Sequence, residues 1–285
     1  MSLPGPATDP SGGRDDGQTP ASTSRPVPHV ALVTGAARRI GREVALALAD
    51  AGWDIGIHYH RSQAEAEQTA ADVRARGRRA VCLAADLSAE AEVGALLPKL
   101  AAALGPVGAV VNNASRFRRD EIESFEFGGL VAHLLPNLAA PLLLARDLAR
   151  RLPADRFGVV VNLLDQKLYN PNPDFLSYTL SKAGLQSATV MLAQALAPQI
   201  RVVGIAPGLT LPSYLQDDAG FADAHRRYSP LGRSSTATDV AAAVVFAIGN
   251  PALTGTVIVV DGGQHLTPMP RDVSLMDELT DRPGD

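Results

Sequence analysis

The chain alternates short apolar runs with longer amphipathic stretches, and this rhythm limits its fold more than any other feature. Runs rich in Val, Ile, Leu and Ala predict buried strands at residues 30–33, 54–58, 80–84, 109–112, 157–164, 201–205 and 256–260. The stretches between them predict helices at residues 39–51, 64–76, 90–104, 127–152, 177–197 and 238–248. Such alternation produces a parallel sheet with right-handed crossovers. We therefore predict an α/β fold, a single Rossmann-like doubly wound domain with a seven-stranded parallel sheet and helices on both faces.

Segments outside this rhythm set the predicted domain boundaries. Residues 1–27 are rich in Pro, Gly, Ser and Thr, and they predict a disordered N-terminal tail because they cannot bury enough apolar surface to offset ordering. Residues 28–266 form the folded domain. Within it, residues 209–236 break the rhythm and predict a substrate lid over the carboxyl ends of the strands. Residues 267–285 form a polar C-terminal tail, either disordered or packed on a neighbouring subunit.

Charge and composition exclude several classes of function. The net charge of −4 argues against nucleic acid or an anionic membrane as the main partner. The single cysteine, Cys82, excludes an intrachain disulfide framework and fits a reducing compartment. The N-terminus lacks a signal-peptide pattern, and no apolar run approaches the roughly 18 residues needed to span a bilayer. The six histidines show no metal-ligand spacing. We predict a cytoplasmic protein without a metal, a nucleic-acid partner or a membrane partner.

A turn at residues 34–41 directly follows the first predicted strand and leads into a helix. This arrangement offers backbone N–H groups and the positive end of a helix dipole to a pyrophosphate. Gly35 permits the sharp turn, and Gly41 allows close helix packing. Arg39 stands where a middle glycine is common and can reach phosphate oxygens or an acidic edge of a substrate. The turn predicts a dinucleotide site, although an ordinary glycine-containing loop would look similar.

The end of the second predicted strand distinguishes between the two nicotinamide cofactors. NAD sites place an acid there to hold the ribose 2′-hydroxyl, but here Tyr59, His60, Arg61 and Ser62 follow the strand. Arginine and hydroxyl donors suit a 2′-phosphate, so NADPH is the predicted cofactor. Asp86, after the third strand, can accept from the adenine amino group or cap the next helix. Residues 112–114 (Asn-Asn-Ala) end the fourth strand and let the backbone approach a ligand.

Tyr178 and Lys182 lie four residues apart, on one face of a predicted helix. There the ammonium can lower the pKa of the phenol, so that Tyr178 acts as a proton donor near neutral pH. Asp165, at the end of the fifth predicted strand, would join this site or simply cap the strand end. Asn137 follows Pro136 and is predicted to order a proton-relay water at a helix irregularity, or to be structural.

These motifs in this order resemble the short-chain dehydrogenase/reductase superfamily over residues 29–266. The turn at 34–41, Asp86, Asn112-Asn113-Ala114, Asn137, the Tyr178/Lys182 pair and Pro207-Gly208 carry the resemblance. Three positions depart from the superfamily pattern: Arg39 replaces a glycine, Asp165 replaces a serine, and Ser115 replaces a glycine.

A larger set resembles the pteridine reductases: Arg39, residues 58–62, residues 113–115 with Phe117, and Asp165 with Tyr178 and Lys182. The resemblance implies that Phe117 stacks a pterin against the nicotinamide, that Ser115 contacts both ligands, and that Asp165, Tyr178 and Lys182 form the catalytic trio. Phe175 replaces an expected tyrosine, so one substrate-orienting hydroxyl is absent. The predicted cofactor contacts are Gly35, Arg39, Ile40, Gly41, Tyr59, His60, Arg61, Ser62, Asp86, Leu87, Asn113, Ala114, Ser115, Tyr178, Lys182, Pro207, Gly208 and Thr210. The predicted substrate contacts are Arg39, Ser115, Phe117, Asp165, Phe175, Tyr178 and Leu209.

The sequence therefore predicts an NADPH-dependent reductase of pterin-type substrates such as dihydropterins, biopterin or dihydrofolate. Hydride would pass to a ring C=N carbon, and Tyr178 or Asp165 would deliver the proton. A carboxylate at 165 suits basic ring nitrogens and predicts faster turnover at mildly acidic pH. The alternatives are a carbonyl or 3-oxoacyl reductase and a non-catalytic NADPH-binding sensor. The resemblance also implies a homotetramer built through the helix that carries Tyr178.

Overall fold

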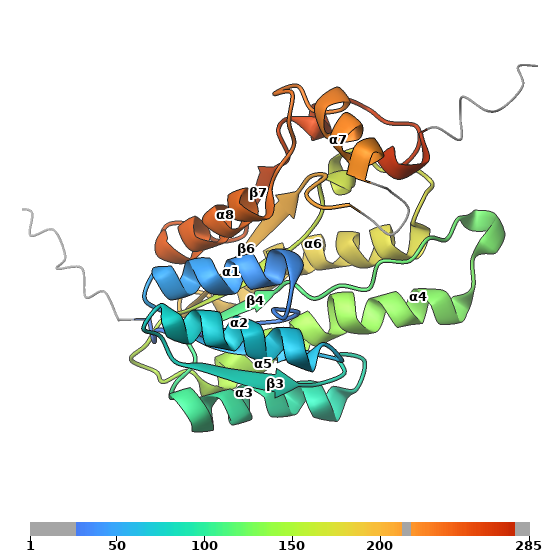
Figure 1. Ribbon diagram of the computed structural model, residues 1–285. Coiled ribbons are helices and arrows are strands. Elements are labelled where there is room, and N and C mark those ends of the chain that lie inside the picture. The colour runs from blue at the N-terminus through green and yellow to red at the C-terminus, as the bar shows by residue number, and fades with distance from the viewer. Residues whose placement is uncertain (1–26, 213–217, 277–285) are drawn as a thin grey trace, which may run out of the picture.

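The computed structural model describes residues 27–212 and 218–276, and it contains one seven-stranded parallel sheet (Figure 1). The strand order is β3-β2-β1-β4-β5-β6-β7, and every pairing is parallel. The strands are β1 (Val30–Val33), β2 (Asp54–Tyr59), β3 (Ala80–Ala84), β4 (Ala109–Asn112), β5 (Gly158–Leu163), β6 (Ile200–Pro207) and β7 (Val257–Val260). The predicted fold class is confirmed. The predicted N-terminal tail lies outside the described residues except for Val27.

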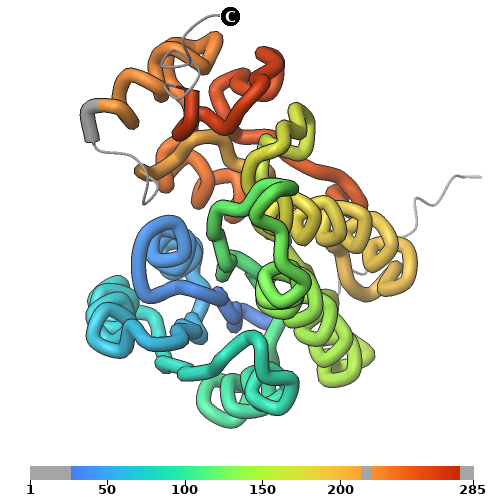
Figure 2. Tube along the Cα trace, turned by 90° about the vertical axis from the view of Figure 1, so that its right-hand side faces the viewer, coloured from blue at the N-terminus to red at the C-terminus, as the bar shows by residue number. Residues whose placement is uncertain are grey.

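Helices cover both faces of the sheet, as Figures 1 and 2 show. One layer contains α1 (Arg39–Asp50), α2 (Gln63–Ala75) and α8 (Ala237–Gly249), and the other contains α3 (Glu90–Leu104), α5 (Ala140–Arg151) and α6 (Leu176–Leu196). Strand β1 is apolar at every position because its side chains pack into both cores. Ala31 and Val33 pack into the first core, whereas Val30 and Leu32 pack into the second. A strand buried on both faces cannot alternate with polar residues.

The strand order reverses beside β1, and this reversal positions the site. The chain runs outward from β1 through β2 to β3, then returns to β4 on the other side of β1. Loops leaving the carboxyl ends of β1 and β4 therefore diverge and leave a crevice between them, where ligands bind in folds of this kind.

The helix predicted at 127–152 is interrupted. It consists of α4 (Phe127–Leu134), a π-helical turn η2 (Leu135–Ala139) and α5. Pro136 has no N–H to donate, which favours an irregular turn at this point. The run Phe127–Arg151 is also long and apolar enough, with a mean hydropathy of 1.6, to cross a bilayer by length and composition. This finding corrects the prediction that no run approaches that length, although α5 packs against α3 and α6 here.

The predicted lid and the segment that follows β7 both fold over the carboxyl ends of the strands. The predicted lid contains α7 (Asp218–Arg227), and residues 213–217 of that lid lie outside the described residues. Short 3-10 helices follow β4 and β5, η1 (Ile122–Ser124) and η3 (Gln166–Tyr169), and two more, η4 (Gln264–Leu266) and η5 (Val273–Leu275), follow β7. Helix η5 contacts α7 (Figure 1), and Leu275 is buried. The predicted boundary at residue 266 is therefore wrong, because residues 267–276 pack on the domain.

Candidate active site

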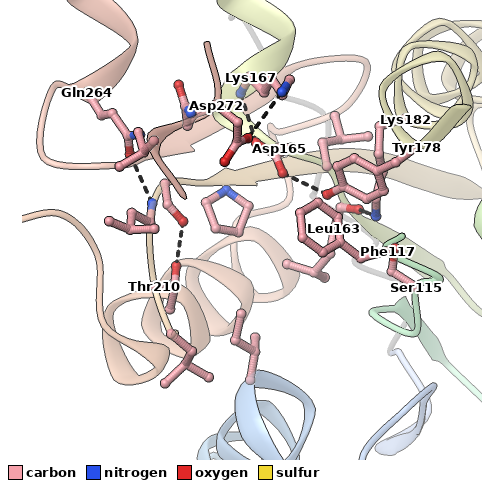
Figure 3. A pocket seen from close by; sticks show the side chains of 18 of the residues that line it. Ser115, Phe117, Leu163, Asp165, Lys167, Tyr178, Lys182, Thr210, Gln264 and Asp272 are labelled. Atoms are coloured by element: carbon pink, nitrogen blue, oxygen red, sulfur yellow. Dashed lines mark hydrogen bonds and ion pairs between the residues drawn. The ribbon is translucent and has the colours of Figure 1, made fainter. Parts of the chain in front are cut away.

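A cavity of about 310 Å³ opens at the carboxyl edge of the sheet (Figure 3). Segments far apart in the sequence build its wall: the turn before α1, the loop after β4, the end of β5, the first turns of α6, the loop after β6 and the C-terminal segment. Twelve predicted site residues line it, namely Arg39, Ile40, Asn113, Ser115, Phe117, Asp165, Tyr178, Lys182, Pro207, Gly208, Leu209 and Thr210. The turn before α1, the end of β4 and the Tyr178 helix thus meet at one cavity. The predicted cofactor contacts that do not line it are Gly35, Gly41, Tyr59, His60, Arg61, Ser62, Asp86, Leu87 and Ala114.

Tyr178, Asp165 and Lys182 lie together at the inner end of this cavity (Figure 3). The Tyr178 hydroxyl donates to Asp165 Oδ2 at 2.7 Å. Lys182 Nζ donates to the Leu163 carbonyl at 2.6 Å and lies 5.8 Å from the centre of the Tyr178 ring. Tyr178 and Lys182 are buried, at 6% and 3% exposure. The phenol, the carboxyl and the ammonium therefore meet where water is scarce.

Burial dominates the protonation of all three groups. It raises the pKa of Tyr178 well above 10, and the charge and hydrogen bond of Asp165 raise that pKa further. Burial lowers the pKa of Lys182 to about 8, and Asp165 opposes this shift. Burial also raises the pKa of Asp165, against the hydrogen bonds from Tyr178 and the Lys167 N–H. The expectation that Lys182 lowers the pKa of Tyr178 is not met, because burial raises that pKa most and the charge and hydrogen bond of Asp165 add to the rise.

Asp165 has a structural role as well as its contact with the phenol. Its Oδ1 accepts the Lys167 N–H at 2.8 Å and caps η3, while its Oδ2 accepts from Tyr178. The two interpretations given for this residue from the sequence are therefore compatible. The cap fixes the carboxyl so that its second oxygen faces the phenol.

The turn at residues 34–41 is tied to the end of β4. Thr34 Oγ1 accepts the N–H groups of Asn113 and Ala114, both at 3.0 Å, and Asn113 Nδ2 donates to the Thr34 carbonyl at 2.8 Å. A Cβ at Gly41 would lie 2.2 Å from the Gly35 carbonyl oxygen, so only glycine fits there. These contacts hold the turn against the strand end, with the first turn of α1 directed at the cavity.

Arg39 adopts a left-handed backbone conformation, with φ of +57°. This conformation favours glycine and costs a non-glycine residue about 1–2 kcal/mol. The guanidinium lines the cavity and donates to the Pro212 carbonyl at 3.0 Å. Arg39 thus links the turn to the base of the lid.

His58, the last residue of the second predicted strand, holds the turn at residues 34–41, a role that was not predicted. It is buried, its Nδ1 accepts the Gly35 N–H at 3.0 Å, and its Nε2 lies 3.1 Å from the Ala85 carbonyl. Both contacts are satisfied together only by a neutral ring that carries its proton on Nε2. Burial, the largest cause, lowers the pKa of His58, which keeps the ring neutral.

We expect His58→Phe to weaken cofactor binding by about 10-fold and to lower the melting temperature. The ring volume is kept, but a buried N–H and a buried carbonyl lose their partners, which costs about 1–3 kcal/mol each. Titration calorimetry with NADPH and thermal melting measure the two effects. Thr189→Val is the control, because it removes a buried hydroxyl of α6 that accepts from Asn162. It should lower stability without changing cofactor affinity, and equal affinity losses in both variants would contradict this role.

The loop after β2 presents exposed polar groups at the far end of the crevice. His60 and Arg61 are exposed, and Tyr59 and Ser62 are half-buried. The His60 Nε2 lies 3.8 Å from Asp86 Oδ2, and Asp86 Oδ1 accepts the Ser88 N–H at 2.8 Å. Leu87 packs its side chain into the second core, so only its backbone can face a cofactor. The donors fit an anionic ribose substituent.

Phe175 does not contact the cavity, contrary to its predicted place among the substrate-binding residues. Its side chain is completely buried, and its ring stacks on that of Phe117, with centres 4.2 Å apart and planes 12° apart. The left-handed backbone at Phe175, with φ of +55°, places the residue at the start of α6 beneath the cavity wall. Phe175 therefore supports Phe117, which lines the cavity together with Tyr178.

Asn137 lies in the π-helical turn and is buried. Its Oδ1 accepts the Arg116 N–H at 2.7 Å, and its Nδ2 donates to the Arg116 carbonyl at 3.0 Å and to Ser181 Oγ at 2.9 Å. The predicted helix irregularity is confirmed. The side chain braces the loop after β4 against α6, and the water relay stays a prediction.

Beyond β6, the first two residues of the predicted lid, Leu209 and Thr210, line the cavity. The Leu209 N–H donates to Gln264 Oε1 at 2.9 Å, and Thr210 Oγ1 donates to the Gly208 carbonyl at 2.8 Å (Figure 3). Twelve further residues in the cavity wall were not predicted, and six of them come from η3 or from segments that follow β7: Lys167, Gln264, Met269, Arg271, Asp272 and Val273. They belong to no local motif, since they reach the cavity from η3 and from segments that follow β7.

The glycine turn before α1 lies where the strand order reverses, and the Tyr178/Lys182 pair on α6 lies at the same cavity. Together these features define a dinucleotide-dependent α/β oxidoreductase. The short chain dehydrogenase family model matches residues 29–219. The chain belongs to this family.

Several known proteins are similar over most of the chain. Pteridine reductase 1 of Leishmania tarentolae is 36% identical, over 86% of this chain and 99% of that protein. The solved structure of FolM alternative dihydrofolate reductase 1 from Brucella canis complexed with NADP is 40% identical, with a TM-score of 0.81 over 86% of this chain and 97% of that one. The 3-oxoacyl-acyl-carrier-protein reductase FabG of Staphylococcus epidermidis is 29% identical, over 83% of this chain and 98% of that protein. The resemblance to the superfamily and to pteridine reductases is confirmed.

Proposed function

We propose that this protein is an NADPH-dependent reductase of pterin-type substrates, including dihydropterins and dihydrofolate. The observation that carries this proposal is the Asp165 carboxyl, 2.7 Å from the Tyr178 hydroxyl in a cavity whose wall includes Phe117. A carboxyl group can hydrogen-bond the ring N–H and amino groups of a pterin, and an aromatic ring can stack on it. The similar proteins named as a pteridine reductase and as an alternative dihydrofolate reductase support the same substrate class.

The residues of the crevice fit NADPH along its length. The turn at Gly35 and Gly41 would hold the pyrophosphate, Arg61 and Ser62 the 2′-phosphate, and Lys182 the nicotinamide ribose. NADPH supplies a hydride when bound. The chain itself supplies the proton: the phenol of Tyr178 donates it to a substrate nitrogen, and the Asp165 carboxyl, whose pKa burial raises, replaces it.

We expect Arg61→Ala to raise the KM for NADPH by about 10- to 100-fold and to leave that for NADH nearly unchanged. A hydrogen-bonded charge pair with a phosphate contributes about 1.5–3 kcal/mol, and NADH has no 2′-phosphate. Initial rates with both cofactors measure the ratio. Arg79→Ala is the charge-matched control, because Arg79 pairs with Asp54 at the opposite end of β2. An equal loss with both cofactors in Arg61→Ala would contradict the assignment.

A parallel assay tests the substrate class. NADPH oxidation is followed with dihydrobiopterin, dihydromonapterin, dihydrofolate and a β-keto ester at the same enzyme concentration. Turnover of the pterins in preference to the ester supports the proposal. The opposite preference would favour a carbonyl or 3-oxoacyl reductase, the activity in the name of the Staphylococcus epidermidis relative. No turnover with any of them would favour an NADPH-binding sensor.

The cytoplasmic location and the homotetramer belong to the same proposal. Exposed apolar side chains on α5 and α6 support self-association, since Leu142, Leu180 and Met191 are 37%, 48% and 66% exposed.

A further inference from the structure

A segment near the C-terminus, residues 269–275, lies across the outer wall of the cavity and is called here the C-terminal strap. Met269, Arg271, Asp272 and Val273 line the cavity, and Leu275 is buried in a cluster with Phe175 and Tyr178. The strap is therefore packed, through Leu275, against the phenol of Tyr178 and the ring of Phe175.

Arg271 fastens the strap to the loop before α6. Its guanidinium makes a bidentate pair with Asp174, with Nη2 2.7 Å from Oδ1 and Nε 2.9 Å from Oδ2, and Nη2 also lies 3.3 Å from Glu121. Asp174 is completely buried. Breaking a buried pair by removing one partner is costly, so this contact is a structural anchor.

Asp272 makes the second contact, with Lys167 of η3 (Figure 3). Its Oδ2 lies 3.1 Å from Lys167 Nζ, and its Oδ1 accepts from the Ser274 N–H and hydroxyl. The Lys167 side chain is only 5% exposed, and its Nζ lies 5.3 Å from the centre of the Phe175 ring. The strap therefore holds a buried ammonium beside the cavity.

Lys167 lies two residues after Asp165, so its ammonium lies near the Asp165 carboxyl. Its own N–H is the group that Asp165 Oδ1 accepts, so the ammonium and the carboxyl belong to one short turn. Both residues line the cavity, and the Lys167 charge favours the ionised form of Asp165. The charged and titratable groups around Lys167 are Asp165 on its own turn, Asp174 before α6, Arg271 and Asp272 on the strap, Tyr178 and Lys182 on α6, and Arg39 across the cavity.

We propose that Lys167 is a positioning residue for the Asp165–Tyr178 proton donor and that the C-terminal strap, through Asp272, controls how strongly its charge acts on Asp165. The negative charge of Asp272 partly neutralises the Lys167 ammonium and so weakens the effect of that ammonium on Asp165. Loss of Lys167 removes a cation that acts on Asp165, whereas loss of the Asp272 charge removes the anion that pairs with that cation. The two losses therefore act on Asp165 in opposite directions. This inference rests on the proposed proton delivery from Asp165.

The test compares Lys167→Met and Asp272→Asn by the pH dependence of kcat. With Asp165 active in its protonated form, Lys167→Met should move the alkaline limb up by roughly one pH unit, because a nearby opposite charge shifts a pKa by about 1–3 units. Asp272→Asn should move the limb down. Lys167→Arg keeps the charge and should leave the limb in place. Thermal melting of each variant reports any loss of folding separately from the position of the limb.

A substrate-free readout separates this inference from the proposed function. The carboxyl ¹³C resonance of Asp165, assigned by its loss in Asp165→Asn, can be titrated in each variant without substrate. Opposite displacements in Lys167→Met and Asp272→Asn support the inference even where no pterin is turned over. Unmoved titrations, or displacements in the same direction with lowered melting temperatures, would show that the strap has only a structural role.

Discussion

Tyr178→Phe is expected to lower kcat for the pterin substrate by about 10²- to 10⁴-fold, the range that a positioned general acid contributes. The ring stays in place because it packs edge-on against Phe117, with centres 4.7 Å apart, and in one cluster with Leu275. Only the hydroxyl that donates to Asp165 is lost. Steady-state rates measure kcat, and the quenching of protein fluorescence by NADPH measures whether the cofactor still binds.

The matched control is Tyr169→Phe, which removes a hydroxyl from an exposed residue of the neighbouring helix η3. Tyr169 is 40% exposed, and its ring packs against His265. We expect its kcat to stay within about twofold of the unaltered protein, since exposed substitutions rarely exceed about 0.5 kcal/mol. A Tyr178→Phe variant that retains most of its kcat would assign the proton transfer to Asp165 or to solvent.

The sequence was sufficient for the sheet and for the residues that line the inner end of the cavity. Parallel strands buried on both faces have continuous apolar runs, so their bounds were predicted to within a few residues. Motifs that follow such strands necessarily share one edge of the sheet. This geometric consequence explains why Asp165, Ser115 and the turn before α1 meet.

The burial of β2 on both faces made the contact between His58 and the turn before α1 unpredictable from the sequence. Residues of β2 on both faces are covered, so alternation along the strand does not show which side chains point toward the nucleotide turn. A histidine within an apolar run was the one available signal, and its partners, Gly35 and Ala85, could be identified only from the packed strands.

The outer wall of the cavity could not be predicted, because its contacts join distant parts of the chain. Lys167 and Asp272 are 105 residues apart, and Arg271 and Asp174 are 97 residues apart. No periodic pattern relates residues at such separations. The polar composition of residues 267–285 favoured a tail, but two charges and Leu275 were enough to fold its first part onto the domain.

Asp165→Ser restores the residue usual in the superfamily, and it tests why this chain departs from the pattern. We expect kcat for pterins to fall by about 10²-fold or more, because the variant lacks the carboxyl that replaces the proton of Tyr178. The β-keto ester should be affected less, since a serine hydroxyl can hydrogen-bond a carbonyl oxygen. Parallel kinetics with both substrates measure the change in preference, and an equal loss for both would contradict a role for Asp165 in substrate choice.

The pH dependence of the same variant gives the second half of the test. Burial raises the pKa of Asp165 above its ordinary 3.8, so the unaltered protein should lose kcat as the pH rises through that raised value. Asp165→Ser should lack this limb, and a flat profile in both proteins would exclude the role. Stability follows the same sign: a carboxyl whose pKa is raised by folding stabilises the fold less as the pH rises above 3.8. The melting temperature of Asp165→Ser minus that of the unaltered protein should therefore increase as the pH rises from acidic to neutral. This measurement requires no substrate.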